Sequence, residues 1–147
     1  MNIFLCFIPF HYFVFKSIYK KLNKSYFAIP PLQDKLLTDE FGGGLSKKGQ
    51  YDYIEDFLNK KNVEVVDYGE KTAKNLTEFL NANCDNVIVP HWFEGINYTH
   101  NSRIVRMMYG LANKESSTYS IENNFLMDLV LTYGDNSAKR FLTVGVQ

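Results

Sequence analysis

The sequence predicts an α/β fold, a three-layer sandwich whose mostly parallel, Rossmann-like sheet of about six strands has helices on both faces. The main observation is the alternation of short apolar runs with longer amphipathic segments along the chain. A second observation is a pair of apolar runs, 103–108 and 126–131, that each end at a Tyr-Gly turn. Both runs are too short for independent helices and rich in Val, Ile, Leu and Met, so we interpret them as buried strands.

The N-terminal segment predicts a βαβ unit with a right-handed crossover. Residues 2–8 form a continuous apolar strand stopped by Pro9, residues 12–22 have apolar side chains at helical spacing, and residues 26–29 form a second strand. The alternative for this uncharged N-terminus is a targeting segment. We favour the strand, because the stretch has no basic leading region and is shorter than the roughly 20 residues that span a bilayer.

The rest of the chain continues the same pattern. Further strands are expected at 63–66 and 86–90, and further helices at 50–60, at 71–80 and from Asp135 or Asn136 to Phe141. The irregular segment 32–50 contains Gly42-Gly43-Gly44. A phosphate-binding loop requires a preceding strand and a fixed glycine spacing that this triplet lacks, so we expect a mobile hinge or lid.

Length and composition narrow the class of protein. A chain of 147 residues corresponds to a single domain, 1–147. Its 16 basic and 16 acidic residues cancel, which argues against nucleic acid as a partner, since nucleic-acid binders usually carry a basic stripe. The two cysteines, Cys6 and Cys84, have no metal-site or redox spacing, which favours a reduced, cytoplasmic protein.

Two of the three histidines are candidate catalytic residues. His11 and His91 each follow a predicted strand, and these two strands would flank the topological switch point of a doubly wound sheet. An imidazole there could accept the proton of a substrate hydroxyl. The alternative is that both rings only bond the backbone beside helices. His100 lies in a polar loop and is expected to be exposed, and no metal site is expected, because carboxylates and cysteines at ligand spacing are lacking.

Neighbouring side chains have two interpretations each. Glu94 either orients His91 or is solvated. Trp92 and Phe93 either form a stacking wall for a sugar or a partner domain, or pack in the core. Arg106 alternates with apolar residues inside a strand, so we expect it to face solvent or a helix rather than to bind phosphate.

Polar residues that follow the two C-terminal strands are candidate substrate-binding residues, because ligands bind at the carboxyl edge of open α/β sheets. They are Tyr109, Gly110, Asn113, Lys114, Tyr133 and Asp135.

The loop at Tyr109-Gly110-Leu111, with Lys114, followed by the strand Asp128-Leu129-Val130-Leu131, resembles the CDP-glycerol glycerophosphotransferase (teichoic acid polymerase) family. More broadly, it resembles the N-terminal acceptor domains of GT-B glycosyltransferases. In the CDP-glycerol glycerophosphotransferase family the loop usually reads His-Gly-x-x-x-Lys. Gly110 and Lys114 match, and Tyr109 stands at the histidine position.

The resemblance implies the acceptor-side half of a glycosyl- or polyol-phosphate transferase in bacterial cell-surface polysaccharide or teichoic-acid-type biosynthesis. It implies a glycan or polyol-phosphate acceptor, no cofactor in this chain, and a nucleotide-activated donor held by a second GT-B domain or partner chain. The isolated chain would then be inactive, and cytoplasmic or peripheral at the inner face of the membrane. His11 would be the base, with His91 orienting it or binding a substrate phosphate. The alternative function is a non-catalytic α/β module that recognises a partner protein or a nucleotide-like ligand.

Overall fold

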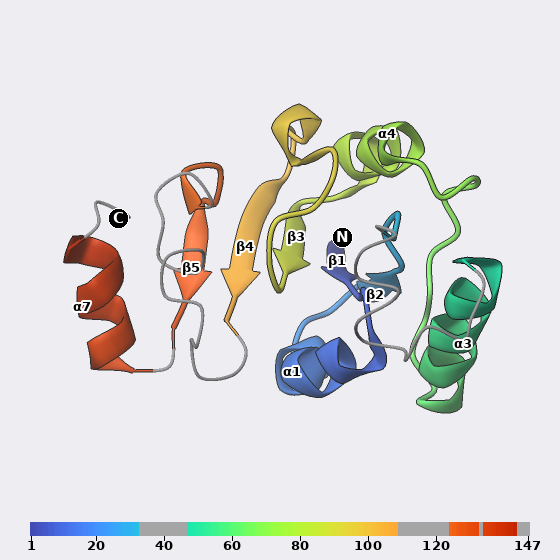
Figure 1. Ribbon diagram of the computed structural model, residues 1–147, viewed down its shortest axis with the longest axis horizontal. Helices are drawn as coiled ribbons and strands as arrows, with labels where there is room; N and C mark the ends of the chain where they lie inside the picture. The colour runs from blue at the N-terminus through green and yellow to red at the C-terminus, as the bar shows by residue number, and fades with distance from the viewer. Residues whose placement is uncertain (33–46, 109–123, 133, 144–147) are drawn as a thin grey trace.

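The computed structural model describes residues 1–32, 47–108, 124–132 and 134–143. Its centre is one parallel sheet in the order β2-β1-β3-β4-β5 (Figure 1). The strands are β1 (Asn2–Leu5), β2 (Ser25–Ala28), β3 (Asn86–Val89), β4 (Arg103–Met107) and β5 (Leu129–Leu131). The predicted α/β class with a parallel, Rossmann-like sheet is confirmed.

The sixth predicted strand, 63–66, forms only an isolated bridge beside β2. Val65 pairs with Phe27, whose N–H donates to the Glu64 carbonyl and whose carbonyl accepts from Val66, both at 2.8 Å. Exposed Glu64 and Asp67 flank this short apolar run, so the segment lies at the sheet edge and pairs at one position only. Among the described residues the sheet therefore has five strands and a bridge, where about six strands were expected.

The helices lie where the spacing of apolar residues predicted them, but their first and last residues differ from the predicted ones. They are α1 (Pro9–Tyr19), α3 (Lys47–Lys60), α4 (Ala73–Asn83) and α7 (Asp135–Thr143), with a short 3-10 helix η1 (Ile96–Tyr98). Pro9 occupies the first turn of α1, where its missing N–H costs nothing, so this helix begins three residues before the expected start. The hydroxyl of Thr72 caps α4 by accepting from the Asn75 N–H at 3.2 Å.

Helices α1 and α4 lie on opposite sides of β1 and β3 in Figure 1. This arrangement follows from the chain path: α1 leads from β1 to β2, whereas α4 leads back to β3 on the other side of β1, and right-handed crossovers in opposite directions lie on opposite faces. The core between α1 and the sheet is aromatic. Phe4 contacts Phe15, Tyr19 and Phe27, with ring centroids 5.5 to 5.7 Å apart.

The glycine triplet 42–44, interpreted as a hinge, lies outside the described residues. Among the residues that are described, no helix is both long and apolar enough to cross a membrane.

Candidate functional site

The register of β1 and β3 brings the two predicted catalytic histidines together. Phe4 pairs with Ile88, so three residues further along both strands Phe7 comes opposite His91. The rings of Phe7 and His91 have centroids 4.3 Å apart. His11 lies in the first turn of α1 and its ring meets His91 edge to face, with centroids 5.7 Å apart. Both imidazoles therefore lie at the carboxyl edge of neighbouring strands, at the topological switch point.

The ring nitrogens of these histidines have different partners. The Nδ1 atom of His11 accepts a hydrogen bond from the N–H of Phe7 at 3.1 Å, so Nδ1 carries no proton and the neutral ring is protonated at Nε2. The Nδ1 atom of His91 lies 2.7 Å from the Trp92 carbonyl oxygen, which can only accept, so this nitrogen carries the proton. Neutral His91 therefore has its lone pair on Nε2. The Trp92 carbonyl therefore orients the His91 ring. Glu94, which was considered for this role, has an exposed side chain.

Burial keeps both imidazoles neutral. It lowers the pKa of His11 from 6.5 to about 3, and the proximity of His91 acts in the same direction, because two protonated rings would repel each other. Burial also lowers the pKa of His91, but its hydrogen bond to Trp92 opposes that effect. His11 is almost completely enclosed, with 1 % of its surface exposed, whereas His91 is only half-buried. Of the two, His91 is the ring that a substrate can reach.

Arg106 adds a positive charge to the same edge of the sheet. It pairs with Val89 across β3 and β4, two residues before His91, and its guanidinium lowers the pKa of His91. Of the two expectations for Arg106, that it faces solvent or a helix, the solvent-facing one is wrong, because only 8 % of the residue is exposed. Its Nη1 atom donates to the Asn124 side-chain oxygen, because a buried guanidinium requires acceptors. Asn124 lies 18 residues from Arg106 in the sequence, and no sequence pattern marks it as a partner of this guanidinium.

Trp92 and Phe93 separate into the two roles considered for them. Phe93 is buried in the core with 1 % exposure, whereas Trp92 remains 39 % exposed directly beside His91. Of these two rings, Trp92 is therefore the one that can offer an aromatic surface to a ligand.

The predicted substrate-binding residues are only partly described. Asp135 begins α7, just past β5, and its side chain is exposed. The other five, Tyr109, Gly110, Asn113, Lys114 and Tyr133, lie outside the described residues.

The two cysteines do not point to thiol chemistry. Burial raises the pKa of the Cys6 thiol to about 12, so this thiol is protonated near neutral pH and is a poor nucleophile. The Cys84 thiol is also buried, and its pKa is likewise raised to about 12. No cluster of histidine, cysteine and carboxylate groups suited to a metal ion occurs among the residues that the structure describes.

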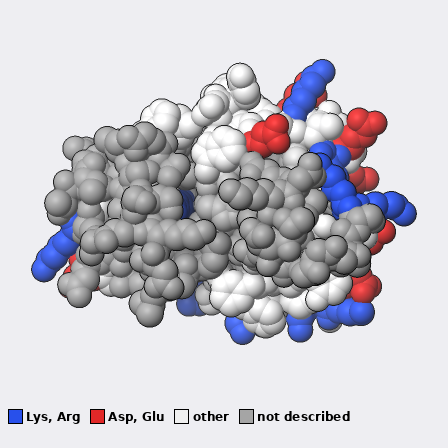
Figure 2. All heavy atoms as spheres, in the orientation of Figure 1, with Lys and Arg blue, Asp and Glu red and all other residues white. Residues whose placement is uncertain are grey.

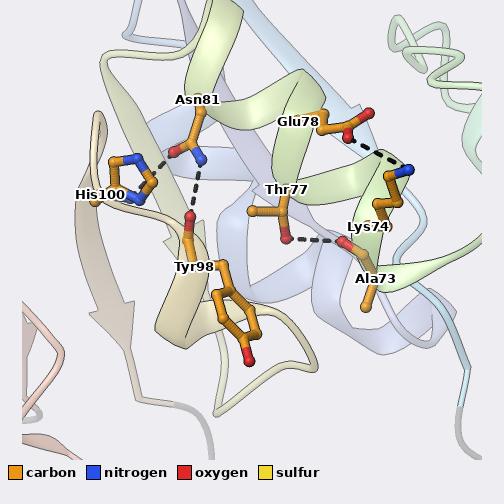
Figure 3. A pocket seen from close by; sticks show the side chains of 7 residues that line it. All are labelled: Ala73, Lys74, Thr77, Glu78, Asn81, Tyr98 and His100. Carbon is orange, nitrogen blue, oxygen red and sulfur yellow. Dashed lines mark hydrogen bonds and ion pairs between the residues drawn. The ribbon is translucent and has the colours of Figure 1, made fainter.

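A groove of about 400 Å³ lies between α4 and the segment that leads into β4 (Figure 3). Asn81 holds that segment in place: its Oδ1 accepts from the N–H groups of His100 at 3.0 Å and Asn101 at 3.3 Å, and its Nδ2 donates to the Tyr98 carbonyl at 2.8 Å. The groove precedes β4, so it lies at the amino edge of the sheet, away from His11 and His91. It contains His100, which is exposed as predicted, and its charged lining residues Lys74 and Glu78 are exposed as well.

No protein-family model, curated protein or solved structure matches this chain.

Proposed function

We propose that this chain is the acceptor-side domain of a glycosyl- or polyol-phosphate transferase that works on bacterial cell-surface glycans or teichoic-acid-type polymers. The observation that carries the proposal is the pair of neutral imidazoles, His11 and His91, at the switch point of a parallel sheet. A transferase of this kind needs a neutral base for the acceptor hydroxyl, and such an edge is where α/β proteins bind their ligands.

In this proposal His91 is the base, rather than His11. The Trp92 carbonyl fixes the Nδ1 proton of His91, which leaves the Nε2 lone pair to take the hydroxyl proton of the acceptor. The acceptor oxygen then bonds to the anomeric carbon or phosphorus of the donor, and the nucleotide leaves with the bonding electrons. His11 acts through His91, because its Nδ1 already accepts from the Phe7 N–H and its ring is enclosed.

Two neighbours fit an anionic, sugar-like acceptor. The charge of Arg106 near His91 favours the neutral base before reaction and attracts an acceptor phosphate. The exposed ring of Trp92 supplies an apolar face against which a sugar or polyol can pack. The nucleotide-activated donor is assigned to a second domain or partner chain, and the family resemblance is the basis for that assignment.

The alternative, a non-catalytic module for a partner protein or nucleotide-like ligand, predicts different ligand preferences at the same edge. Imidazole resonances of His91 and His11 should be followed by NMR during addition of glycerol-phosphate oligomers, and separately of cytidine nucleotides. We expect the oligomers to perturb His91 first and the nucleotides to leave it unchanged. Perturbation by nucleotides alone would favour the alternative and contradict the acceptor-side proposal.

A matched pair of variants locates the binding. Trp92→Ala should weaken oligomer binding about tenfold, because it removes the exposed aromatic face. Tyr98→Ala removes an aromatic ring that is 71 % exposed in the groove at the other edge, and should leave oligomer binding unchanged. Equal loss in both variants would place the acceptor elsewhere.

A further inference from the structure

Phe7 contacts both imidazoles of the site, through its backbone and through its ring. It lies two residues past the end of β1 and is buried. Its backbone N–H donates to Nδ1 of His11 at 3.1 Å. Its ring lies against the ring of His91, with centroids 4.3 Å apart and planes tilted by 40°, and also meets the His11 ring edge to face at 5.8 Å. One residue therefore links the two histidines to each other and to the end of β1.

The His91 ring is held from three directions, and Phe7 provides the broadest of these contacts. The Trp92 carbonyl meets Nδ1 at 2.7 Å, His11 meets the ring edge to face, and Phe7 covers one face. A hydrogen bond at one ring atom does not fix the ring plane, because rotation of an imidazole about its χ2 bond is only weakly restricted. The stacked ring of Phe7 does fix that plane, since aromatic pairs prefer defined offset geometries.

No carboxylate takes over this orienting role among the residues that the structure describes. A buried carboxylate orients the histidine in many active sites. In Figure 2 the acidic side chains lie mostly on the right, over α3 and α4 of Figure 1, and Glu94, the acidic residue closest to His91 in the sequence, is exposed. The charged side chain that shifts the pKa of His91 is Arg106, a cation. The plane of the His91 ring therefore depends on apolar packing against Phe7.

We infer that Phe7 is a positioning residue, whose ring fixes the plane of His91 so that the Nε2 lone pair keeps one direction. The inference rests on the proposed function, in which His91 takes the proton of the acceptor hydroxyl. A base must come within about 2.6–3.2 Å of the atom that gives up the proton, so a rotated ring would miss it. The backbone of Phe7 adds a second support, because it holds His11, which contacts the edge of His91.

Substitution separates the two contributions of Phe7, because Phe7→Leu removes the ring and keeps the backbone N–H. NMR chemical shifts of the imidazole nitrogens report which nitrogen carries the proton. In the wild-type chain we expect His11 to be protonated at Nε2 and His91 at Nδ1. In Phe7→Leu the His11 shifts should stay the same, whereas the His91 shifts should move towards the average of both tautomers. A general loss of structure would change the signals of both rings.

Control variants keep the volume change and the ring separate. Phe27→Leu removes a buried ring from β2, where it contacts Phe4 and Tyr19, and should leave the His91 signals unchanged. Phe7→Tyr retains a stacked ring and should keep the wild-type signals. If Phe7→Leu does not fold, Phe7→Met fills more of the space with a flexible chain and carries the same expectation. Circular dichroism verifies the fold of every variant.

Turnover supplies the second measurement, with the donor-binding domain and both substrates present. Phe7→Leu should lower kcat roughly 10–100-fold and change the acceptor KM less than about twofold, because a small misplacement of a catalytic group can cost ~10²-fold in rate. Unchanged His91 signals in Phe7→Leu, equal changes in Phe27→Leu, or normal kcat of Phe7→Leu beside an inactive His91→Ala would each overturn the inference. Wild-type turnover by His91→Ala, with the His91 signals of Phe7→Leu moved as expected, would instead refute the transferase proposal and retain the contact role of Phe7.

Discussion

The imidazole rings of His11 and His91 meet edge to face, with their centroids 5.7 Å apart, although the two residues belong to different β–α connections. Each ring has a fixed hydrogen-bond direction: His11 accepts from a backbone N–H, and His91 contacts a backbone carbonyl. Two neutral histidines with opposite proton positions can remain in contact without charge repulsion. Protonation of either ring would disturb the pair, and this has measurable consequences.

We expect His11 to make the protein sensitive to acid. Its folded-state pKa of about 3 lies below the ordinary 6.5, so below pH 6.5 the unfolded chain binds a proton that the folded chain does not. The free energy of unfolding should therefore fall as the pH is lowered from 6.5 towards 3, by about 1.4 kcal/mol per pH unit for this residue. Urea unfolding at pH 7, 6 and 5 measures this slope.

His11→Gln removes the titrating ring and should flatten that slope, even if stability at pH 7 also changes. The control His100→Gln alters an exposed side chain and should keep the wild-type slope. A His11→Gln protein with the same pH dependence as the wild type would contradict the assignment of a depressed pKa to His11.

Gly95 is expected to tolerate no side chain. It has φ +97°, and a Cβ atom there would lie 2.5 Å from the Thr77 hydroxyl oxygen and 3.3 Å from the Ala73 carbonyl oxygen. Gly95→Ala should therefore lower the free energy of unfolding by roughly 2–4 kcal/mol, which combines backbone strain with the clash. Gly134 is the control, because it also has a positive φ, +80°, but nothing within 4 Å of its Cβ position. Gly134→Ala should cost about 1–2 kcal/mol, and equal costs would exclude the clash.

Asn81 should be the main support of the segment before β4. Asn81→Ala leaves three backbone groups, those of Tyr98, His100 and Asn101, without the amide that contacts them. Because these groups are near the surface and water replaces part of the loss, we expect a decrease of about 1–3 kcal/mol in urea unfolding. Asn83→Ala removes one exposed bond, to the Phe79 carbonyl, and should cost under about 1 kcal/mol. Similar losses in both variants would contradict this role.

The parallel α/β sheet could be predicted because its signals are local. Apolar runs such as 2–8 and 103–108 contain the strands, and each ends near a proline or glycine. The meeting of His11 and His91 followed from the strand order of doubly wound sheets. The edge segment 63–66 has a strand-like sequence too, but whether such a run pairs along its length depends on contacts that its sequence does not encode.

The finer assignments depended on tertiary contacts. Alternation of side chains in β4 could place Arg106 on one face of the sheet. It could not reveal that the Arg106 guanidinium donates a hydrogen bond to the side chain of Asn124. The choice between His11 and His91 as base depends on which ring nitrogen meets a backbone N–H and which meets a carbonyl. No residue pattern encodes that distinction, since both histidines simply follow a strand.

The turnover of His91 variants tests the central proposal most directly. With a nucleotide-activated donor, a glycerol-phosphate acceptor and the donor-binding domain present, His91→Ala should lower kcat by ~10²–10⁴-fold, the usual effect of losing a general base. His91→Ala should also remove the acidic limb of the pH–rate profile, whereas His100→Ala, at an exposed histidine of the far edge, should leave both kcat and the profile unchanged. Near wild-type turnover by His91→Ala, or an equal loss in His100→Ala, would contradict the assignment of His91 as the base.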